Sequence, residues 1–479
     1  MEKNFYHLRS NSNGNQTSAF PFLNTSKSLT ILETEDYSVM NEELIQGYRD
    51  FLDNGKTERE CISETVKAAV DKGYRELCTV TELKPGDKVY HVNRDKSIAL
   101  FHIGSEDIEK GMNILGAHID SPRLDLKMKP LYEKDGIVYL NTHYYGGIKK
   151  YQWVAHPLAL HGVVFRKDGT CALVNVGEDE DDTALCISDI LPHIAQDQMK
   201  KTASEFFPGE DLDLVVGLTP RGSEENDAGK NAIMELIKER YDIEESDFLS
   251  AELEVVPAGK TRMLGFDRSM ILGYGQDDRV CSYTSLQALL EAEGVPERTA
   301  CCLLVDKEEI GSTGATGMDS ALLPNILSEV LSLLGKTSDL SLRRTLRNSY
   351  MLSSDVNSAY DPLHTELYDK QNSSVLDGGV VFNKYTGSRG KSGASDANPE
   401  FIAKLRKVMD DNGVTFQMAE MARVDVGGGG TIAKFAAYYG MEVIDCGVAV
   451  LSMHAPWEIT SAFDVESAYN CYRAFLTLK

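Results

Sequence analysis

The sequence has no run of about 18 apolar residues, no CxxC pair and no GxxxxGK[ST] motif. These absences argue against a membrane-spanning helix, a CxxC-type structural zinc site and a P-loop for phosphate. The nine cysteines are odd in number and most have apolar neighbours, so we expect buried free thiols rather than a disulfide framework. Because the first residues lack the apolar core of a signal peptide, we expect a cytoplasmic protein with no membrane partner.

Basic residues are also scarce. The chain has 49 lysines and arginines against 74 aspartates and glutamates, which gives a formal net charge of −25. Nucleic acids and anionic membranes both require a basic footprint, so neither is an expected partner. At 479 residues the chain exceeds one ordinary hydrophobic core, and we expect two or more domains.

The order of strand-like and helix-like segments predicts an α/β protein made of three stretches. In residues 1–122, about 25 polar residues that we expect to be loosely ordered come first. A helix follows from Thr57, which has the spacing of a capping box with Glu60. Residues 123–266 contain short strands separated by polar turns, which predicts an inserted β-rich domain. In residues 267–479 strands and helices alternate, as is typical of an α/β layered fold.

Two segments of the last stretch are interpreted in more detail. MILGYGQDD (270–278) is predicted to be a strand that leads into an amphipathic helix through Leu286, Leu289 and Leu290. MEVIDCGVAV (441–450) is predicted to be a single strand. Both segments run toward residues that could carry chemistry.

Five apolar strands in the outer two stretches end in acidic residues or histidine. In chain order these residues are His118 and Asp120, Asp277 and Asp278, Glu308 and Glu309, Asp355, and His454. Functional sites of open α/β sheets gather beyond the carboxyl ends of strands, so these side chains are expected to meet in one cleft. Two imidazoles with several carboxylates suit zinc, cobalt or manganese better than calcium, which prefers oxygen ligands alone.

Spacing suggests individual roles. Residues two apart share one face of a strand, so Asp120 could contact the ring of His118 and fix its tautomer. Asp277 has two carboxylate oxygens and could bridge two ions, which lie about 3.5–4 Å apart in paired-metal hydrolytic sites. The side chains of Glu308 and Glu309 cannot point the same way, so one could be a ligand and the other a general base. Taken alone, this pair would be interpreted as a solvated acidic turn.

Other candidates also have simpler interpretations. His118 could be a core histidine whose hydrogen bonds are satisfied, and Asp355 could be a turn residue or a helix cap. The glycine-rich segment 426–435 is typical of a tight entry to a helix rather than a phosphate cradle. Gly429 and Gly430 could still place backbone N–H groups near a substrate.

Six ordered motifs make the sequence resemble a known family. They are AHIDSPRLDLK (117–127), HYYGGIKKYQW (143–153), GQDDRVCSYTSLQAL (275–289), DKEEIGSTGATGMDS (306–320), SSDVNSAYDP (353–362) and MHAPWEITSAFD (453–464). In order and spacing they are similar to the aspartyl aminopeptidase family of zinc metallopeptidases, most closely to its bacterial branch. The resemblance extends from about residue 45 to the end of the chain.

The resemblance implies a two-zinc aminopeptidase acting on short peptides. An α/β/α sandwich catalytic domain, in residues 1–122 and 267–479, would be interrupted by a β-rich dimerisation domain in residues 123–266. Members of the family assemble as tetrahedral particles of twelve subunits with enclosed active sites. A homododecamer built from dimers is therefore expected.

Carried over residue by residue, the resemblance implies the metal ligands. His118 and Asp355 would bind one metal ion, and Glu309 and His454 would bind the other. Asp277 would bridge the two ions.

The resemblance also implies roles for residues around the ions. Glu308 would be the general base, Asp120 would orient His118, and Asp278 would take a supporting position. Lys384 matches a lysine associated with recognition of acidic side chains.

Three positions depart from the family pattern. Ser358 stands where members that prefer acidic N-terminal residues carry a histidine. Asp197 stands where a histidine reaches the active site of a neighbouring subunit, and His156 replaces the arginine of a WxDRPL motif. The ligand set is complete, whereas a preference for Asp or Glu is left open.

The sequence therefore predicts a metal-dependent aminopeptidase that removes an acidic or neutral N-terminal residue through a water activated by two metal ions. A paired-metal deacylase or carboxypeptidase-like hydrolase is an alternative with the same kind of donor set. A non-catalytic assembly protein with a vestigial site is the alternative from another class, and the complete ligand set argues against it.

Overall fold

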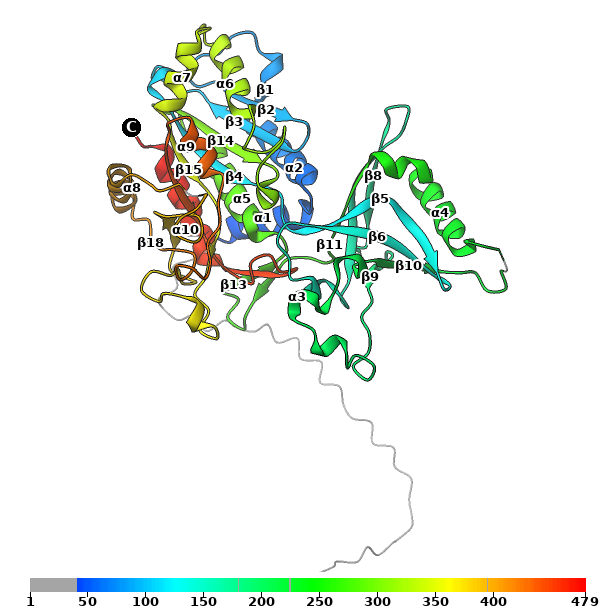
Figure 1. Cartoon of the computed structure of the whole chain (residues 1–479). Coiled ribbons are helices and arrows are strands. Elements are labelled where there is room, and N and C mark those ends of the chain that lie inside the picture. Colours follow the sequence, from blue (N-terminus) through cyan, green and yellow to red (C-terminus); the bar gives the residue numbers. More distant parts are fainter. Residues whose placement is uncertain (1–40, 180, 224, 394) are drawn as a thin grey trace, which may run out of the picture. The chain divides into compact units, whose positions relative to one another are not determined.

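The computed structural model describes residues 41–479, apart from residues 180, 224 and 394 (Figure 1). The polar N-terminal residues expected to be loosely ordered lie outside this part. Within it the chain has a mixed α/β fold with sheets of nine, seven and five strands. Among these described residues, no helix combines the length and apolar character needed to cross a membrane.

The nine-stranded sheet positions the candidate site. Its strands in spatial order are β1 (Arg75–Glu76), β2 (Lys88–Asn93), β3 (Ser97–His102), β14 (Thr299–Val305), β4 (Met112–His118), β15 (Tyr350–Ser353), β19 (Glu442–Gly447), β17 (Val380–Asn383) and β18 (Phe416–Met418). Strands β14, β4, β15 and β19 are parallel to their neighbours in this group. Their carboxyl ends therefore lie along one edge of the sheet.

Both faces of this sheet are covered, because the central strands are apolar throughout. Every residue of β14 is buried. Cys302 and Leu304 belong to one apolar cluster, and Cys301 and Leu303 to another. The first cluster also contains residues of α1 (Glu42–Asn54), α2 (Glu58–Asp71), α5 (Gln276–Leu290), α8 (Pro399–Asp411) and α10 (Ala462–Leu476). The second contains residues of α6 (Leu322–Leu333), α7 (Asp339–Arg347) and α9 (Ala433–Tyr438).

Two helices illustrate how local and tertiary signals differ. Helix α2 begins after Thr57, and both hydrogen bonds of the capping box with Glu60 are present, which confirms the prediction. Helix α5 is not amphipathic, so that prediction is wrong. Every residue of α5 except Gln287 is buried, because α1, α10 and β4 pack around it.

The seven-stranded sheet is antiparallel and comes from residues 123–257. Its strands in spatial order are β8 (Cys171–Val176), β7 (Leu158–Phe165), β11 (Ala251–Pro257), β5 (Arg123–Lys134), β6 (Ile137–Tyr145), β10 (Leu214–Leu218) and β9 (Cys186–Ile187). Helices α3 (Ala203–Phe206) and α4 (Ala228–Tyr241) belong to the same stretch. Strands β5 and β11 and helix α4 were not anticipated from the sequence, since charged residues interrupt their apolar patterns.

The five-stranded sheet corrects two sequence predictions. Its strands in spatial order are β12 (Arg262–Leu264), β13 (Met270–Gly273), β21 (Glu458–Ser461), β20 (Ala449–Leu451) and β16 (Asn357–Ser358). Residues 441–450 are not one strand but β19 and β20, which belong to different sheets. Strand β19 ends at Gly447. A Cβ at this position would lie 2.0 Å from the Asp355 carbonyl oxygen, so no side chain fits there. Residues 270–278 are likewise a short strand followed by the first turn of α5.

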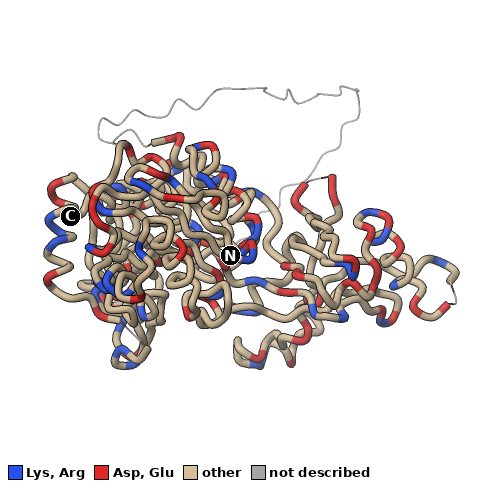
Figure 2. Tube along the Cα trace, turned by 90° about the horizontal axis from the view of Figure 1, so that it is seen from above, with Lys and Arg blue, Asp and Glu red and all other residues tan. Residues whose placement is uncertain are grey.

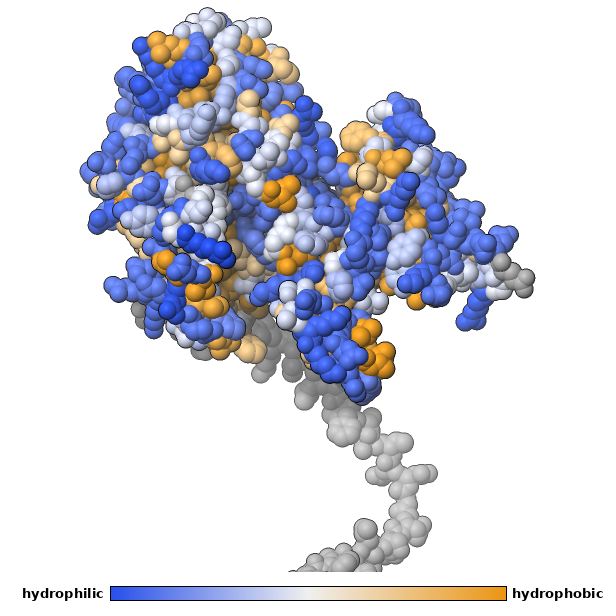
Figure 3. Space-filling view, in the orientation of Figure 1, coloured by the Kyte–Doolittle hydropathy of each residue, from blue (hydrophilic) through white to orange (hydrophobic). Residues whose placement is uncertain are grey.

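The surface carries charges of both signs. Acidic and basic residues are interspersed along the described chain (Figure 2). On the face shown in Figure 3, hydrophilic side chains predominate and apolar ones form small separate groups. The segment 190–199 exposes Ile190, Leu191, Ile194 and Met199.

His161 on β7 connects α2 to the loop after β8. It is buried, with Nδ1 2.8 Å from Glu60 Oε1 and Nε2 3.1 Å from Glu178 Oε1. Burial lowers the pKa of His161, but the two carboxylates outweigh burial and raise the pKa above its usual value. A raised folded-state pKa stabilises the fold below the unfolded pKa of about 6.5, and this contribution is lost as pH rises through the folded value. We expect His161→Gln to lower the urea midpoint more at pH 5.5 than at pH 9; equal losses would contradict this.

Candidate metal centre

Three neighbouring strands bring predicted residues to one edge of the nine-stranded sheet. His118 ends β4, the Glu308–Glu309 pair follows β14, and Asp355 follows β15. The structure thus confirms the strand-end prediction for these residues.

Asp277 and His454 reach the same place from a different sheet. Asp277 lies in the first turn of α5, and His454 lies in the loop between β20 and β21. These residues follow β13, which ends at Gly273, and β20, which ends at Leu451, so they do not lie at strand ends of the nine-stranded sheet.

Asp277 lies between the two histidines. Its Oδ1 is 3.2 Å from His118 Nε2, and its Oδ2 is 3.1 Å from His454 Nε2. Glu309 Oε1 is 3.5 Å from His454 Nε2, and Asp355 Oδ1 is 3.9 Å from His118 Nε2. One oxygen of Asp277 therefore faces each imidazole, and each imidazole has a second carboxylate beside it.

Both histidines present Nε2 to this space because Nδ1 has its own partner. His118 Nδ1 lies 3.0 Å from the backbone carbonyl oxygen of Asp120 and 3.4 Å from its Oδ1. His454 Nδ1 lies 2.9 Å from the carbonyl oxygen of Gly147. When Nδ1–H donates to these acceptors, Nε2 keeps a lone pair for a metal ion.

Five carboxylates crowd this space, from Asp277, Asp278, Glu308, Glu309 and Asp355. Burial is the main cause that raises the pKa values of Asp278, Glu309 and Asp355 well above their usual range, and neighbouring carboxylates add to it. Burial also acts on Asp277, but the two histidines lower its pKa below the usual range. Two imidazoles could not neutralise all of these buried carboxyl groups if every one were ionised.

The donor set fits divalent cations. Among the described residues, the buried atoms without a hydrogen-bond partner include Asp277 Oδ1, Glu309 Oε1 and both carboxylate oxygens of Asp278. Ligand atoms lie within 4.8 Å of one another in two groups, His118 with Asp278 and Asp355, and His118 with Asp277 and Glu309. Imidazole–carboxylate sets of this kind suit zinc, cobalt or manganese. Asp278 thereby joins the candidate ligands, whereas the resemblance implied a supporting position.

Glu308 belongs to neither of these two groups of candidate metal ligands. It begins the 3₁₀ turn Glu308–Ile310, in which the backbone N–H groups of Glu308 and Glu309 donate to Asp120 Oδ1 and Oδ2, each at 3.1 Å. Burial raises the pKa of Glu308 to about 7; the histidines oppose this rise, and Asp120 and Asp277 add to it. A carboxylate with this pKa is suited to accept a proton near neutral pH.

Residues 145–147 support the site from the end of β6 and were not predicted to do so. The Tyr145 hydroxyl donates to Asp120 Oδ2 at 2.9 Å. Gly146 has a φ of +75°, and a Cβ there would lie 3.3 Å from the Glu309 Cβ. Gly147 supplies the carbonyl that accepts from the histidine ring. Only the HYYGG motif marked these residues in the sequence, and it assigned them no role.

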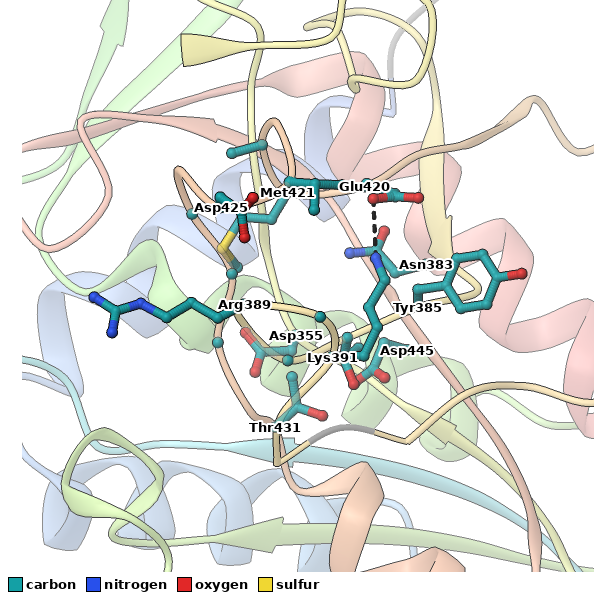
Figure 4. Close-up of a pocket in the computed structure, with 18 of the residues that line it drawn as sticks. Asp355, Asn383, Tyr385, Arg389, Lys391, Glu420, Met421, Asp425, Thr431 and Asp445 are labelled. Atoms are coloured by element: carbon teal, nitrogen blue, oxygen red, sulfur yellow. Dashed lines mark hydrogen bonds and ion pairs between the residues drawn. The ribbon is translucent and has the colours of Figure 1, made fainter.

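A pocket opens beside Asp355 (Figure 4). Its other lining residues come mainly from segments 383–391 and 420–431. The cationic residues that line it are Arg389 and Lys391, and Lys391 Nζ lies 3.0 Å from Glu420 Oε2. The pocket therefore contains a paired cation next to the metal centre.

The predicted substrate-binding residues divide between the pocket and its surroundings. Gly429 lines the pocket, whereas Lys384 and Gly430 are not among its lining residues. Lys384 Nζ instead lies 4.8 Å from the centre of the Tyr385 ring. Of the two lysines beside Tyr385, Lys391 lines the pocket and Lys384 does not.

Comparisons with known proteins identify the family of this chain. The model of the aminopeptidase I zinc metalloprotease (M18) family matches residues 51–476. A probable M18 family aminopeptidase 1 from Clostridium acetobutylicum is 54% identical over 434 residues, which cover 90% of this chain and 93% of that protein. The crystal structure of an M18 family aminopeptidase from Thermotoga maritima is 42% identical, with a TM-score of 0.88 over 92% of this chain and 97% of that one.

A more distant likeness shows the same fold. The structure of an mApe1 dodecamer from S. cerevisiae is 21% identical and has a TM-score of 0.71, covering 91% of this chain and 96% of that one. The family model spans most of the sequence, and the clostridial relative is more than half identical over nine-tenths of it. This chain therefore belongs to the M18 family of zinc aminopeptidases.

Proposed function

We propose that this M18 aminopeptidase binds two divalent metal ions per subunit and removes the N-terminal residue of short peptides. The observation that carries the proposal is the position of Asp277, which turns one oxygen toward each imidazole. His118 and Asp355 would hold one ion, and Glu309 and His454 the other. Zinc is the ion named by the family, and the same donors also suit cobalt or manganese.

The side chains around the centre would have different chemical roles. A bound pair of ions supplies polarisation of the scissile carbonyl and a lower pKa for water, about 7 on zinc. Glu308 accepts the proton of the attacking water and returns it to the departing amine. Asp120 fixes this base, because it accepts both backbone N–H groups of the glutamate turn and is itself held by Tyr145. A free α-amino group on the substrate could bind one of these ions, which would exclude internal peptide bonds.

A panel of free and N-blocked aminoacyl reporters tests this proposal. Metal-reconstituted protein is expected to hydrolyse the free reporters and to leave their N-acetylated counterparts intact. Chelator treatment should abolish the activity, and added zinc, cobalt or manganese should restore it. Cleavage of the blocked reporters at a comparable rate would instead support a paired-metal deacylase.

The pocket beside Asp355 is proposed to receive the side chain of the N-terminal residue. Lys391 is the half-buried cation of this pocket, and Glu420 already neutralises it at 3.0 Å. Arg389 is exposed (Figure 4). Lys391 is already paired and Arg389 is exposed, so neither offers a substrate an unpaired, half-buried cation. We therefore propose that neutral rather than acidic N-terminal residues are the preferred substrates.

Replacement of Glu420 provides the test of side-chain preference. Glu420→Gln frees Lys391 and is expected to raise kcat/KM for N-terminal Asp and Glu about 1.5- to 5-fold relative to Leu, the range for a partly exposed ion pair. Adding Lys391→Met to this variant should remove the gain. A wild type that already prefers Asp or Glu, or a Glu420→Gln variant with unchanged preference, would contradict the assignment.

The domain arrangement and assembly are proposed with the same function. Residues 1–122 and 267–479 would form an α/β/α sandwich, and residues 123–266 an inserted dimerisation domain. Support comes from the separate seven-stranded sheet of residues 123–257 and from the apolar clusters of the nine-stranded sheet.

We propose a homododecamer in the cytoplasm, built from dimers. The exposed apolar side chains of segment 190–199 suit a contact with a second copy, and the yeast dodecamer shares the fold. Light scattering during size-exclusion chromatography is expected to give the mass of twelve subunits.

A further inference from the structure

Glu458 connects the two segments that carry Asp277 and His454. It begins β21, is 1% exposed, and pairs with Gly273 of β13 in the five-stranded sheet. Its Oε2 accepts the backbone N–H of Asp277 at 3.0 Å, and its Oε1 accepts the backbone N–H of His454 at 2.7 Å. One carboxylate therefore holds the main chain of two residues that face each other across the centre.

Both segments adopt backbone conformations that need outside support. Ser452 and His454 have φ angles of +59° and +65°, in the left-handed region that residues other than glycine rarely adopt. Asp277 has a φ of −80° and a ψ of 107° although it lies in the first turn of a helix. Because Asp277 lies in the first turn, its backbone N–H has no acceptor within the helix.

Glu458 is itself held in place. The side-chain amide of Gln276 donates to the Glu458 carbonyl oxygen at 2.6 Å and to the Ile271 carbonyl oxygen at 3.2 Å. The Tyr48 hydroxyl on α1 donates to Gln276 Oε1 at 3.0 Å. A buried chain of hydrogen bonds thus runs from α1 to the main chain of Glu458.

We propose that Glu458 is a positioning residue that sets the separation and direction of Asp277 and His454 for metal binding. An ionised carboxylate accepts at both oxygens, as two N–H donors require. Glutamine has the same shape but offers one acceptor and one donor, so one of the two N–H groups would lose its partner and meet an N–H. The inference rests on the ligand assignment proposed above.

The test compares Glu458→Gln with a matched variant elsewhere in the fold. Asp464 is also a fully buried carboxylate, and its Oδ1 and Oδ2 accept the backbone N–H groups of Gly379 and Asp377 at 2.7 and 2.9 Å. Neither of those residues is a candidate ligand. Asp464→Asn therefore removes the same kind of interaction at a place that does not position the centre.

Zinc affinity is measured by competition with a chromophoric chelator, and the Co(II)-substituted proteins are compared by their visible absorption spectra. Glu458→Gln is expected to bind zinc about 10- to 100-fold more weakly, the range for residues that orient metal ligands, and to shift the Co(II) spectrum. Asp464→Asn should lower the thermal midpoint of the metal-free protein about as much as Glu458→Gln does, and its loss of zinc affinity should stay well below about 10-fold.

Two results would overturn the proposal. One is wild-type zinc affinity with an unchanged Co(II) spectrum in Glu458→Gln. The other is an equal loss of affinity in Asp464→Asn, which would show a general effect of stability. If Glu458→Gln does not fold, Glu458→Asp keeps the charge but shortens the reach, and wild-type affinity there would also overturn it. If Asp277→Asn binds zinc normally, the ligand assignment fails instead.

Discussion

Glu308→Gln is expected to keep the metal content of the wild type and to lose about 10²- to 10⁴-fold in kcat, the range contributed by a positioned general base. Glu308 lies outside both groups of candidate ligands. Burial raises the pKa of its carboxyl to about 7, so near neutral pH it can alternate between accepting and returning a proton. Glutamine preserves the shape of the side chain but cannot take up a proton. Saturating kinetics on a free aminoacyl reporter and metal analysis of the same preparation measure the two quantities.

The adjacent residue supplies the matched control. Glu309 Oε1 is buried, has no hydrogen-bond partner among the described residues and lies 3.5 Å from His454 Nε2. Glu309→Gln is therefore expected to lose metal together with activity, whereas Glu308→Gln loses activity alone. Near-normal turnover in Glu308→Gln would contradict the assignment of Glu308 as the general base. Equal loss of metal in both variants would make Glu308 a ligand.

The part of the site that could be predicted from sequence lies on the nine-stranded sheet. Strands β4 and β14 contain continuous apolar runs, as buried parallel strands do; β4 ends at His118, and β14 ends at Val305, shortly before Glu308. Val305 is the register partner of His118 in these strands, so Glu308 must come near that histidine. Continuous apolar runs thus carried enough information to place His118, Glu308 and Glu309 together.

The other half of the site depends on tertiary packing that no local pattern shows. Asp277 and His454 follow strands β13 and β20 of the five-stranded sheet, which are only four and three residues long. Glu458 accepts a backbone hydrogen bond from each of these two residues, and its hydrogen bond from Asp277 spans 181 residues of sequence. Tyr145 is likewise 25 residues from the carboxylate that it holds. A spacing of this kind has no periodicity from which it could be predicted.

The pocket beside Asp355 shows a third reason why part of the site could not be predicted from the sequence. Lys384 and Lys391 are seven residues apart in one loop, and both ammonium groups lie 4.8 Å from the centre of the Tyr385 ring. Composition alone does not distinguish them. The conformation of the loop brings Lys391 to Glu420 and into the pocket lining, which decides the charge that a substrate meets.

Asp277→Asn is expected to abolish binding of both metal ions under conditions that saturate the wild type, a loss of affinity of at least about 100-fold. Residues that only orient ligands already contribute 10- to 100-fold, and Asp277 contacts both imidazoles directly. A carboxamide keeps one oxygen and turns an NH₂ group, which is no ligand, toward either His118 or His454. Metal analysis after dialysis against limiting zinc, together with kcat, measures the outcome.

Asp278→Asn distinguishes a bridging carboxylate from its neighbour. The oxygens of Asp278 group with His118 and Asp355 only, so this variant is expected to weaken one ion at most and to recover activity at high zinc. Asp277→Asn should not recover, because no concentration of zinc restores an oxygen on both sides. Two tightly bound ions in Asp277→Asn, or loss of both ions in Asp278→Asn alone, would transfer the bridging role to Asp278. The distances from the two carboxylate oxygens of Asp277 to the two histidines favour Asp277.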